Sequence, residues 1–269
     1  MRPAQTHTQK GKGFFFLTIL LFTCSLAIAQ TPPTMYLGIR FYKVAPENIA
    51  EFEKTMTETW KPVNQFRKQN GNIFNWSFFR VQFKGTLDEF NYATVTYFDS
   101  FAKTEDNVKW AELLKTVNPK ANVDAVIARW QKIATTVKQH LYVLSETATP
   151  KSPVPYKYAV VTYMKTKPGM ANAYDKILKE EWKPVHQAMI DAGQMARWNV
   201  WKLVVPAGAE INHDLFTSNL FSTYDQALMA GYSDAFKKAG KDTQTILDQS
   251  SQSRDMVRRE LLELLVGLN

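Results

Sequence analysis

Two copies of one short segment contain the side chains with the clearest chemical potential. The first copy reads Trp60-Lys61-Pro62-Val63-Asn64-Gln65 and the second reads Trp182-Lys183-Pro184-Val185-His186-Gln187, so His186 stands where the first copy has Asn64. An imidazole can accept a proton near neutral pH and can ligate haem iron. Because Trp182, Glu180 and Glu181 are close in sequence, His186 is the candidate catalytic residue, as a general base or an axial haem ligand.

The alternative for His186 is a structural role, since a single helical histidine is more often exposed or hydrogen-bonded than catalytic. His140 and His213 have no spacing to His186 that is typical of a metal site. The sequence contains no HExxH pattern, nucleophile elbow, phosphate-binding loop or dinucleotide fingerprint. It therefore predicts no metal site and no cofactor, with haem kept only as the alternative that His186 allows.

Aromatic side chains dominate the segments predicted to be strands, and a few polar residues lie among them. Such strands can line an apolar space that suits a small apolar or aromatic ligand. Ordinary core packing explains the same pattern equally well. The candidate ligand-binding residues are Trp60, Asn64, Trp76, Trp182, His186, Arg197 and Trp198.

Pro62 and Pro184 interrupt helices that otherwise show a continuous apolar stripe. A proline inside a helix removes a backbone donor and clashes with the carbonyl four residues earlier, which costs about 3 kcal/mol. The affected carbonyls are predicted to belong to Glu58 and Glu180. The resulting kink either exposes a carbonyl to a pocket or lets the helix wrap around the sheet.

Two copies of one fold are predicted to position these side chains. Residues 36–83 align without a gap with residues 158–205, an offset of 122. Twelve positions in that alignment are identical. The first copy is predicted to contain strands 36–43, 73–83, 89–99 and 140–145, a helix from Pro46 to about Asn70, and a helical region 101–138 broken near Pro119. The second is predicted to contain strands 158–165, 195–205 and 215–222, helices 168–193 and 226–258, and a final strand 261–266.

Each copy thus has the order β-α-β-β-α-β of a ferredoxin-like unit. The predicted domains are residues 35–147 and 156–269, joined by a proline-rich linker over 148–155. The composition of residues 256–269 suits a helix as well as a strand, so the sequence leaves the end of the chain open. Strands 73–83 and 195–205 are apolar on both faces, which predicts that both faces are covered.

On these features the chain resembles the dimeric α+β barrel superfamily, in which two ferredoxin-like units pack sheet to sheet. The resemblance implies an α+β fold with both units in one chain, as a monomeric pseudo-dimer or a homodimer. It resembles in particular the exported tandem versions of this fold. It also implies the activities that the fold supports, which include cofactor-independent monooxygenases, haem-degrading enzymes, chlorite dismutase relatives and stress-responsive proteins.

The N-terminus predicts export. Three basic residues precede an apolar run from Phe14 to Leu26, and Ala27-Ile28-Ala29 follows, which is typical of a signal peptide over residues 1–29. The only cysteine, Cys24, lies within it. The 33 basic and 25 acidic residues are scattered and match no nucleic-acid motif, so no nucleic-acid partner and no transmembrane segment in the mature chain are expected. We expect a periplasmic or extracellular protein.

Three functions follow as hypotheses. The first is an exported protein that binds a small apolar or aromatic ligand in or beside the barrel without a metal. The second is a cofactor-independent monooxygenase or a haem-handling enzyme, with His186 as base or ligand. The third is a structural or interaction module without a ligand.

Overall fold

A computed structural model describes residues 34–85, 88–105, 108–208 and 210–268. The predicted signal peptide over residues 1–29 lies outside the described residues. Among the described residues, no helix has both the length and the apolar character needed to cross a membrane.

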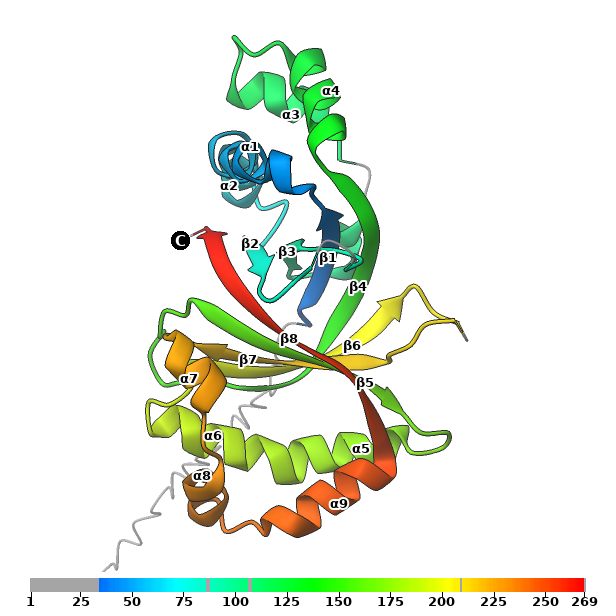
Figure 1. The fold of residues 1–269 in the computed structure, drawn as a ribbon, viewed down its shortest axis with the longest axis vertical. Coiled ribbons are helices and arrows are strands. Elements are labelled where there is room, and N and C mark those ends of the chain that lie inside the picture. Colours follow the sequence, from blue (N-terminus) through cyan, green and yellow to red (C-terminus); the bar gives the residue numbers. More distant parts are fainter. Residues whose placement is uncertain (1–33, 86–87, 106–107, 209, 269) are drawn as a thin grey trace, which may run out of the picture. The chain divides into compact units, whose positions relative to one another are not determined.

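Eight antiparallel strands form a closed barrel in the order β1-β3-β2-β8-β5-β7-β6-β4 (Figure 1). The predicted α+β class and barrel are therefore confirmed. The strands are β1 (Tyr36–Lys43), β2 (Asn75–Val81), β3 (Tyr92–Phe98), β4 (Thr135–Ala148), β5 (Tyr158–Thr166), β6 (Arg197–Val205), β7 (Leu215–Phe221) and β8 (Arg254–Gly267).

Two seams close the barrel, and each joins strands from different halves of the chain. At one seam β2 pairs with β8, with Val81 opposite Leu262, and at the other β4 pairs with β6, with Leu144 opposite Trp201. Within the halves, β1 lies between β3 and β4, and β5 lies between β7 and β8. The order of strands and helices is the same in both halves.

Helices cover the outside of the barrel on two sides (Figure 1). In the N-terminal half these are the short turn η1 (Pro46–Asn48), α1 (Ile49–Thr55), η2 (Met56–Trp60), α2 (Lys61–Gln69), η3 (Phe101–Thr104), α3 (Trp110–Val117) and α4 (Val123–Ile133). In the C-terminal half they are α5 (Ala171–Ile177), η4 (Leu178–Trp182), α6 (Lys183–Asp191), α7 (Tyr224–Met229), α8 (Ser233–Lys238) and α9 (Thr243–Ser253).

The two helix prolines are accommodated by a widened turn. Both η2 and η4 are π-helical, and the backbone amide of Lys61 donates to Met56 O, five residues earlier, as Lys183 does to Leu178 O. A π turn before the proline relieves the clash that an α-helical register would impose at that ring. The structure therefore locates the predicted irregularity as a bulge repeated in both halves.

The barrel interior is filled with side chains. One buried cluster takes residues from all eight strands, among them Phe41, Phe79, Val95, Tyr142, Tyr163, Trp201, Phe216 and Leu262. Two further clusters lie between the sheet and the helices, one in each half. The strands are thus covered on both faces, as their composition predicts.

The predicted ends of two helical regions are wrong. Residues 135–138 and 254–258 were expected to be helical, but they begin β4 and β8, where Thr135 pairs with Lys43 and Arg254 with Thr166. Both strands are 14 residues long because each must pair with two neighbours in succession. The end of the chain, which the sequence left open, is therefore a strand up to Gly267.

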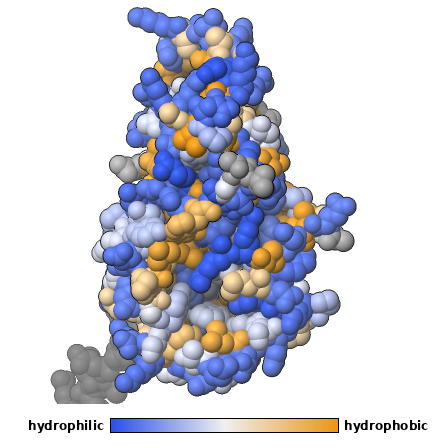
Figure 2. Space-filling model, viewed as in Figure 1, coloured by the Kyte–Doolittle hydropathy of each residue, from blue (hydrophilic) through white to orange (hydrophobic). Residues whose placement is uncertain are grey.

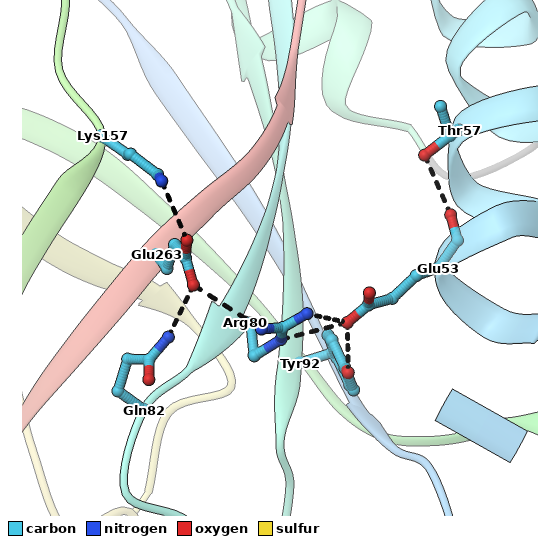
Figure 3. A network of polar contacts seen from close by, with 7 residues as sticks. All are labelled: Glu53, Thr57, Arg80, Gln82, Tyr92, Lys157 and Glu263. Carbon is cyan, nitrogen blue, oxygen red and sulfur yellow. Dashed lines mark hydrogen bonds and ion pairs between the residues drawn. The ribbon is translucent and has the colours of Figure 1, made fainter. Parts of the chain in front are cut away.

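A polar network ties the first helix to the β2–β8 seam (Figure 3). Glu53 Oε1 accepts from Arg80 Nη2 at 2.5 Å and from the Tyr92 hydroxyl at 2.6 Å. Glu263, across the seam, accepts from Gln82 at 2.8 Å and lies 3.3 Å from Lys157 Nζ. Gln82 belongs to the N-terminal half and Glu263 to the C-terminal half, so the hydrogen bond between them links the two halves across the seam.

Core packing inside the barrel should dominate stability. Phe79→Ala removes a ring that is 4% exposed in the interior, and we expect it to lower the free energy of unfolding by about 3–5 kcal/mol. Phe74→Ala is the matched control, because Phe74 is 54% exposed and should cost less than about 1 kcal/mol. Urea denaturation measures both, and equal losses would contradict a filled interior.

Candidate functional site

The N-terminal half contains a cavity of about 430 Å³ between the outer face of β1 and β3 and the helices that cover it. Its size falls within the range of small-molecule sites. Aromatic and aliphatic side chains form most of its wall, and a few polar groups converge on it. The lining includes Gly38, Arg40, Tyr42, Met56, Trp60, Asn64, Arg67, Trp76, Thr94, Thr96, Phe98, Glu105, Trp110, Ile127, Trp130, Gln139 and His140.

Three tryptophans form one side of the cavity. The ring centroid of Trp60, in the π turn, lies 5.5 Å from that of Trp110 and 5.3 Å from that of Trp130, in edge-to-face geometry. These contacts hold the rings of three separate elements in fixed orientations. They leave planar aromatic surface in the lining, where an aromatic ligand can stack.

The Trp60 indole carries a polar atom that the described residues do not satisfy. Its Nε1 is buried and has no hydrogen-bond partner in the part of the chain that the structure describes. A buried donor without a partner costs about 1–3 kcal/mol. Its counterpart, Trp182, donates its Nε1 to Ser250 Oγ at 2.9 Å. Trp198 Nε1, in the C-terminal half, is also buried without a partner among the described residues, but Trp198 does not line this cavity, whereas Trp60 does.

Asn64 holds a buried arginine in the same wall. Its Nδ2 donates to Trp60 O at 2.9 Å, and its Oδ1 accepts from Arg67 Nη1 at 3.0 Å. Arg67 Cζ lies 5.0 Å from the centroid of the Trp110 ring, and Arg40 Cζ lies 5.4 Å from the same centroid. Asn64 therefore positions Arg67, and two guanidinium groups flank one indole.

A glycine leaves room for the cavity in the sheet. Gly38 lies on β1, and a Cβ atom placed there would be 3.2 Å from the Phe98 ring. In the C-terminal half Val160 occupies the equivalent position, since Gly38 pairs with Thr96 and Leu141 as Val160 pairs with Asn219 and Leu261. The C-terminal half therefore has a side chain on the outer face of its sheet where the N-terminal half has none.

In the C-terminal half, the region equivalent to the Asn64 and Arg67 wall is packed with side chains. The His186 ring stacks on Trp198 with centroids 4.7 Å apart and an angle of 9° between the planes. Its Nδ1 lies 2.8 Å from Trp182 O, the carbonyl equivalent to the one that Asn64 contacts. Met189, which aligns with Arg67, is fully buried in the same cluster. This half thus replaces the asparagine and arginine by packing.

The predicted site residues therefore divide into two groups. Trp60, Asn64 and Trp76 line the cavity of the N-terminal half. Trp182, His186 and Trp198 pack together beneath the helices of the C-terminal half, and Arg197 is exposed at the start of β6. The structure does not bring the two groups into one site.

Sequence reasoning missed Gly38, Arg40, Arg67, Trp110 and Trp130 as cavity residues. Arg67, a charged residue of an amphipathic helix, is buried. A signal was available, because the internal alignment pairs Gly38 with Val160, Arg40 with Thr162 and Arg67 with Met189. Positions where the copies differ in size or charge mark the half that has the cavity.

The surroundings of His186, the predicted haem ligand, do not suit binding of haem or of a metal ion. One face of the His186 ring is stacked on Trp198 and its Nδ1 contacts the Trp182 carbonyl. His186 does not line the cavity of the N-terminal half, so a haem bound there would not reach it. Among the described residues, no group of three His, Cys, Asp or Glu side chains could hold a metal ion.

Three buried histidines are held neutral. Burial lowers the pKa of His186 to about 3 and the pKa values of His140 and His213 to about 4. His213 Nδ1 lies 2.9 Å from Asn212 Oδ1, so its Nε2 accepts from the Tyr142 hydroxyl at 2.9 Å. His140 Nδ1, at 2.9 Å, then donates to that oxygen. These hydrogen bonds form a chain through Tyr142, which belongs to the buried cluster of the barrel interior.

Comparison with solved structures supports the fold. The chain superposes on a proposed monooxygenase from Fusobacterium nucleatum with a TM-score of 0.55 and 12% identity, over 89% of this chain and 96% of that one. A proposed monooxygenase from Lactobacillus acidophilus (TM-score 0.47, 9% identity, 88% and 100% covered) and a haem-binding protein from Thermus thermophilus (0.47, 10%, 88% and 95%) are also similar. No protein-family model matches the sequence, and no curated protein matches it. The likeness to the Fusobacterium nucleatum protein supports the α+β barrel fold.

Acid should destabilise the protein through these histidines. Their folded-state pKa values lie below the unfolded value of about 6.5, so the unfolded chain binds more protons and stability falls as pH drops below 6.5. His186→Asn, which copies the other half, should reduce this slope by about 0.7 kcal/mol per pH unit at pH 6.5, rising to about 1.4 kcal/mol per pH unit near pH 5. Denaturation at several pH values measures the slope, and an unchanged slope would contradict a neutral buried His186.

Proposed function

We propose that the cavity of the N-terminal half binds a small planar aromatic molecule that carries a hydrogen-bond acceptor. The observation that carries this proposal is the buried Trp60 Nε1, which has no partner among the described residues and lies on a side chain of the cavity lining. A ligand carbonyl that accepts from this donor would remove the cost of its burial.

The remaining lining supports the same ligand class. Indole faces suit stacking, and the guanidinium groups of Arg40 and Arg67 add positive charge beside them. Glu105 supplies a negative charge to the same wall. We therefore favour a neutral or weakly acidic aromatic ketone or quinone over a cation.

We further propose that the protein acts outside the cytoplasm as a duplicated ferredoxin-like pair. The two Trp-Lys-Pro-Val segments at an offset of 122 and the similar order of strands and helical regions support a duplication, and the N-terminal sequence supports export. In this proposal the C-terminal half supplies the barrel partner that a second subunit would provide in a dimer, and only the N-terminal half keeps the aromatic site.

Calorimetry with two matched ligands tests the binding proposal. We expect menadione, an aromatic quinone, to bind more tightly than 2-methylnaphthalene, which lacks the carbonyl groups. Trp60→Phe keeps an aromatic ring but removes the donor, so it should weaken menadione binding by about fivefold and leave the hydrocarbon unaffected. Gly38→Val should weaken both ligands because it fills the cavity.

Trp182→Phe is the control for these variants, because the Trp182 indole donates to Ser250 and does not line the cavity of the N-terminal half. It should bind both ligands as the unmodified protein does. Binding that survives Gly38→Val, or a loss in Trp182→Phe equal to that in Trp60→Phe, would contradict the cavity as the site.

A cofactor-independent monooxygenase is the second candidate, supported by the description of the Fusobacterium nucleatum protein and by the shared fold. A CH₂ group of the bound aromatic would then react with O₂, so that one oxygen atom becomes the new carbonyl and the other leaves as water with the two hydrogens that the CH₂ group loses.

Incubation of the protein with anthrone and ¹⁸O₂ tests this activity, because the oxygenation of anthrone to anthraquinone places one ¹⁸O atom in the new carbonyl. We expect labelled product at a rate above the uncatalysed one, and a rate reduced at least tenfold in Gly38→Val because the cavity is filled. A rate equal to that of buffer would exclude this candidate and leave binding. In a parallel experiment with added haem, we expect the position of the Soret band to be the same for the unmodified protein and for His186→Ala.

A further inference from the structure

A second cavity of about 430 Å³ lies in the C-terminal half, between the outer face of β5, β7 and β8 and the segment around α7. We propose that it binds an amphipathic carboxylate such as a medium-chain fatty acid, with the anionic head at Arg259 and the chain along the apolar wall. This site is separate from the aromatic cavity and does not depend on the function proposed for that cavity.

The position of Arg259 supplies the charge. It lines the cavity, is exposed, and forms no ion pair with any other described residue. Arg259 pairs with Thr162 on β5 as Gln139 pairs with Arg40 on β1, so it is the register equivalent of Gln139. The two cavities therefore differ in the chemistry of this position.

The one carboxylate in the lining is already compensated. Glu260 Oε1 lies 2.8 Å from Lys84 Nζ and 3.3 Å from Arg258 Nε. Neither approach has hydrogen-bond geometry, but at these distances both cations offset its charge. Arg259 thus remains as net positive charge for a ligand.

A second donor lies in the same wall. Asn219 Nδ2 donates to Tyr232 Oη at 2.8 Å, which leaves the phenolic hydrogen for an acceptor. Burial raises the pKa of Tyr232, so the hydroxyl stays protonated near neutral pH. A carboxylate can therefore receive a charge-assisted hydrogen bond from Arg259 and a neutral one from Tyr232.

Exposed apolar side chains continue the wall to the surface. Val160, Phe221 and Leu261 form its base, while Phe83 and Leu228 at the rim are 78% and 50% exposed. Phe83 has φ of 58°, a left-handed conformation that is uncommon for an aromatic residue and is found where structure or function requires it. Figure 2 shows hydrophobic surface gathered over the region of α7. An alkyl chain would cover this surface.

Calorimetry with decanoate and decanol tests the proposal, because the two ligands share a chain and differ in the head group. Arg259→Gln, which copies Gln139, should weaken decanoate about tenfold and leave decanol unchanged. Phe83→Ala should weaken both by several fold. Lys238→Gln removes the same charge from the exposed surface of α8 and should change neither.

Two results would overturn the proposal. One is decanoate affinity that is equal in Arg259→Gln and Lys238→Gln, and the other is decanoate affinity that is lost in Gly38→Val, which would place the ligand in the N-terminal cavity. Circular dichroism and the urea midpoint check that each variant is folded. Because menadione reports on the other cavity, failure of either site can be told apart from failure of the other.

Discussion

The inner face of each half-sheet can leave water only by packing against the inner face of the other half. Phe79 of β2, Leu262 of β8, Trp201 of β6 and Tyr142 of β4 meet in one buried cluster that neither half could form alone. Backbone pairing at the β2–β8 and β4–β6 seams then satisfies the outermost strands. With no free strand at these edges, the barrel avoids the exposed pairing groups that promote aggregation.

Closing the barrel in this way uses up its interior and moves any binding site to the outside of the sheet. The space between strands and helices differs between the halves because a few equivalent positions differ. Gly38 and its equivalent Val160 line different cavities, one without and one with a side chain at this position, and Arg67 donates to Asn64 where the equivalent Met189 is buried in an apolar core. Asn64 and His186 nevertheless contact equivalent carbonyls, so the helix geometry is kept while the chemistry beside it changes.

The sequence predicted the strands and long helices well where periodicity was strong. The strand over 36–43 and the strand nature of 261–266 are confirmed. The predictions failed at residues 135–138 and 254–258, because the pairing partners that extend β4 and β8 are distant in sequence. For the site, Trp60, Asn64 and Trp76 were named from the sequence, but Arg67 was not, since helical spacing alone does not show that a charged residue can be buried on an amide and an indole.

The sequence by itself determined the internal similarity, the α+β class and the need to cover both faces of the sheet, because these follow from identity at a fixed offset and from local patterns of apolar residues. It also marked the Trp-Lys-Pro-Val segments as irregular, since proline cannot complete the helical hydrogen bonds. Only the tertiary structure decided that His186 is packed and Trp60 is left without a partner. That difference depends on which side chains from other elements, Ser250 for Trp182 and Trp198 for His186, reach the helix, and no local pattern encodes such contacts.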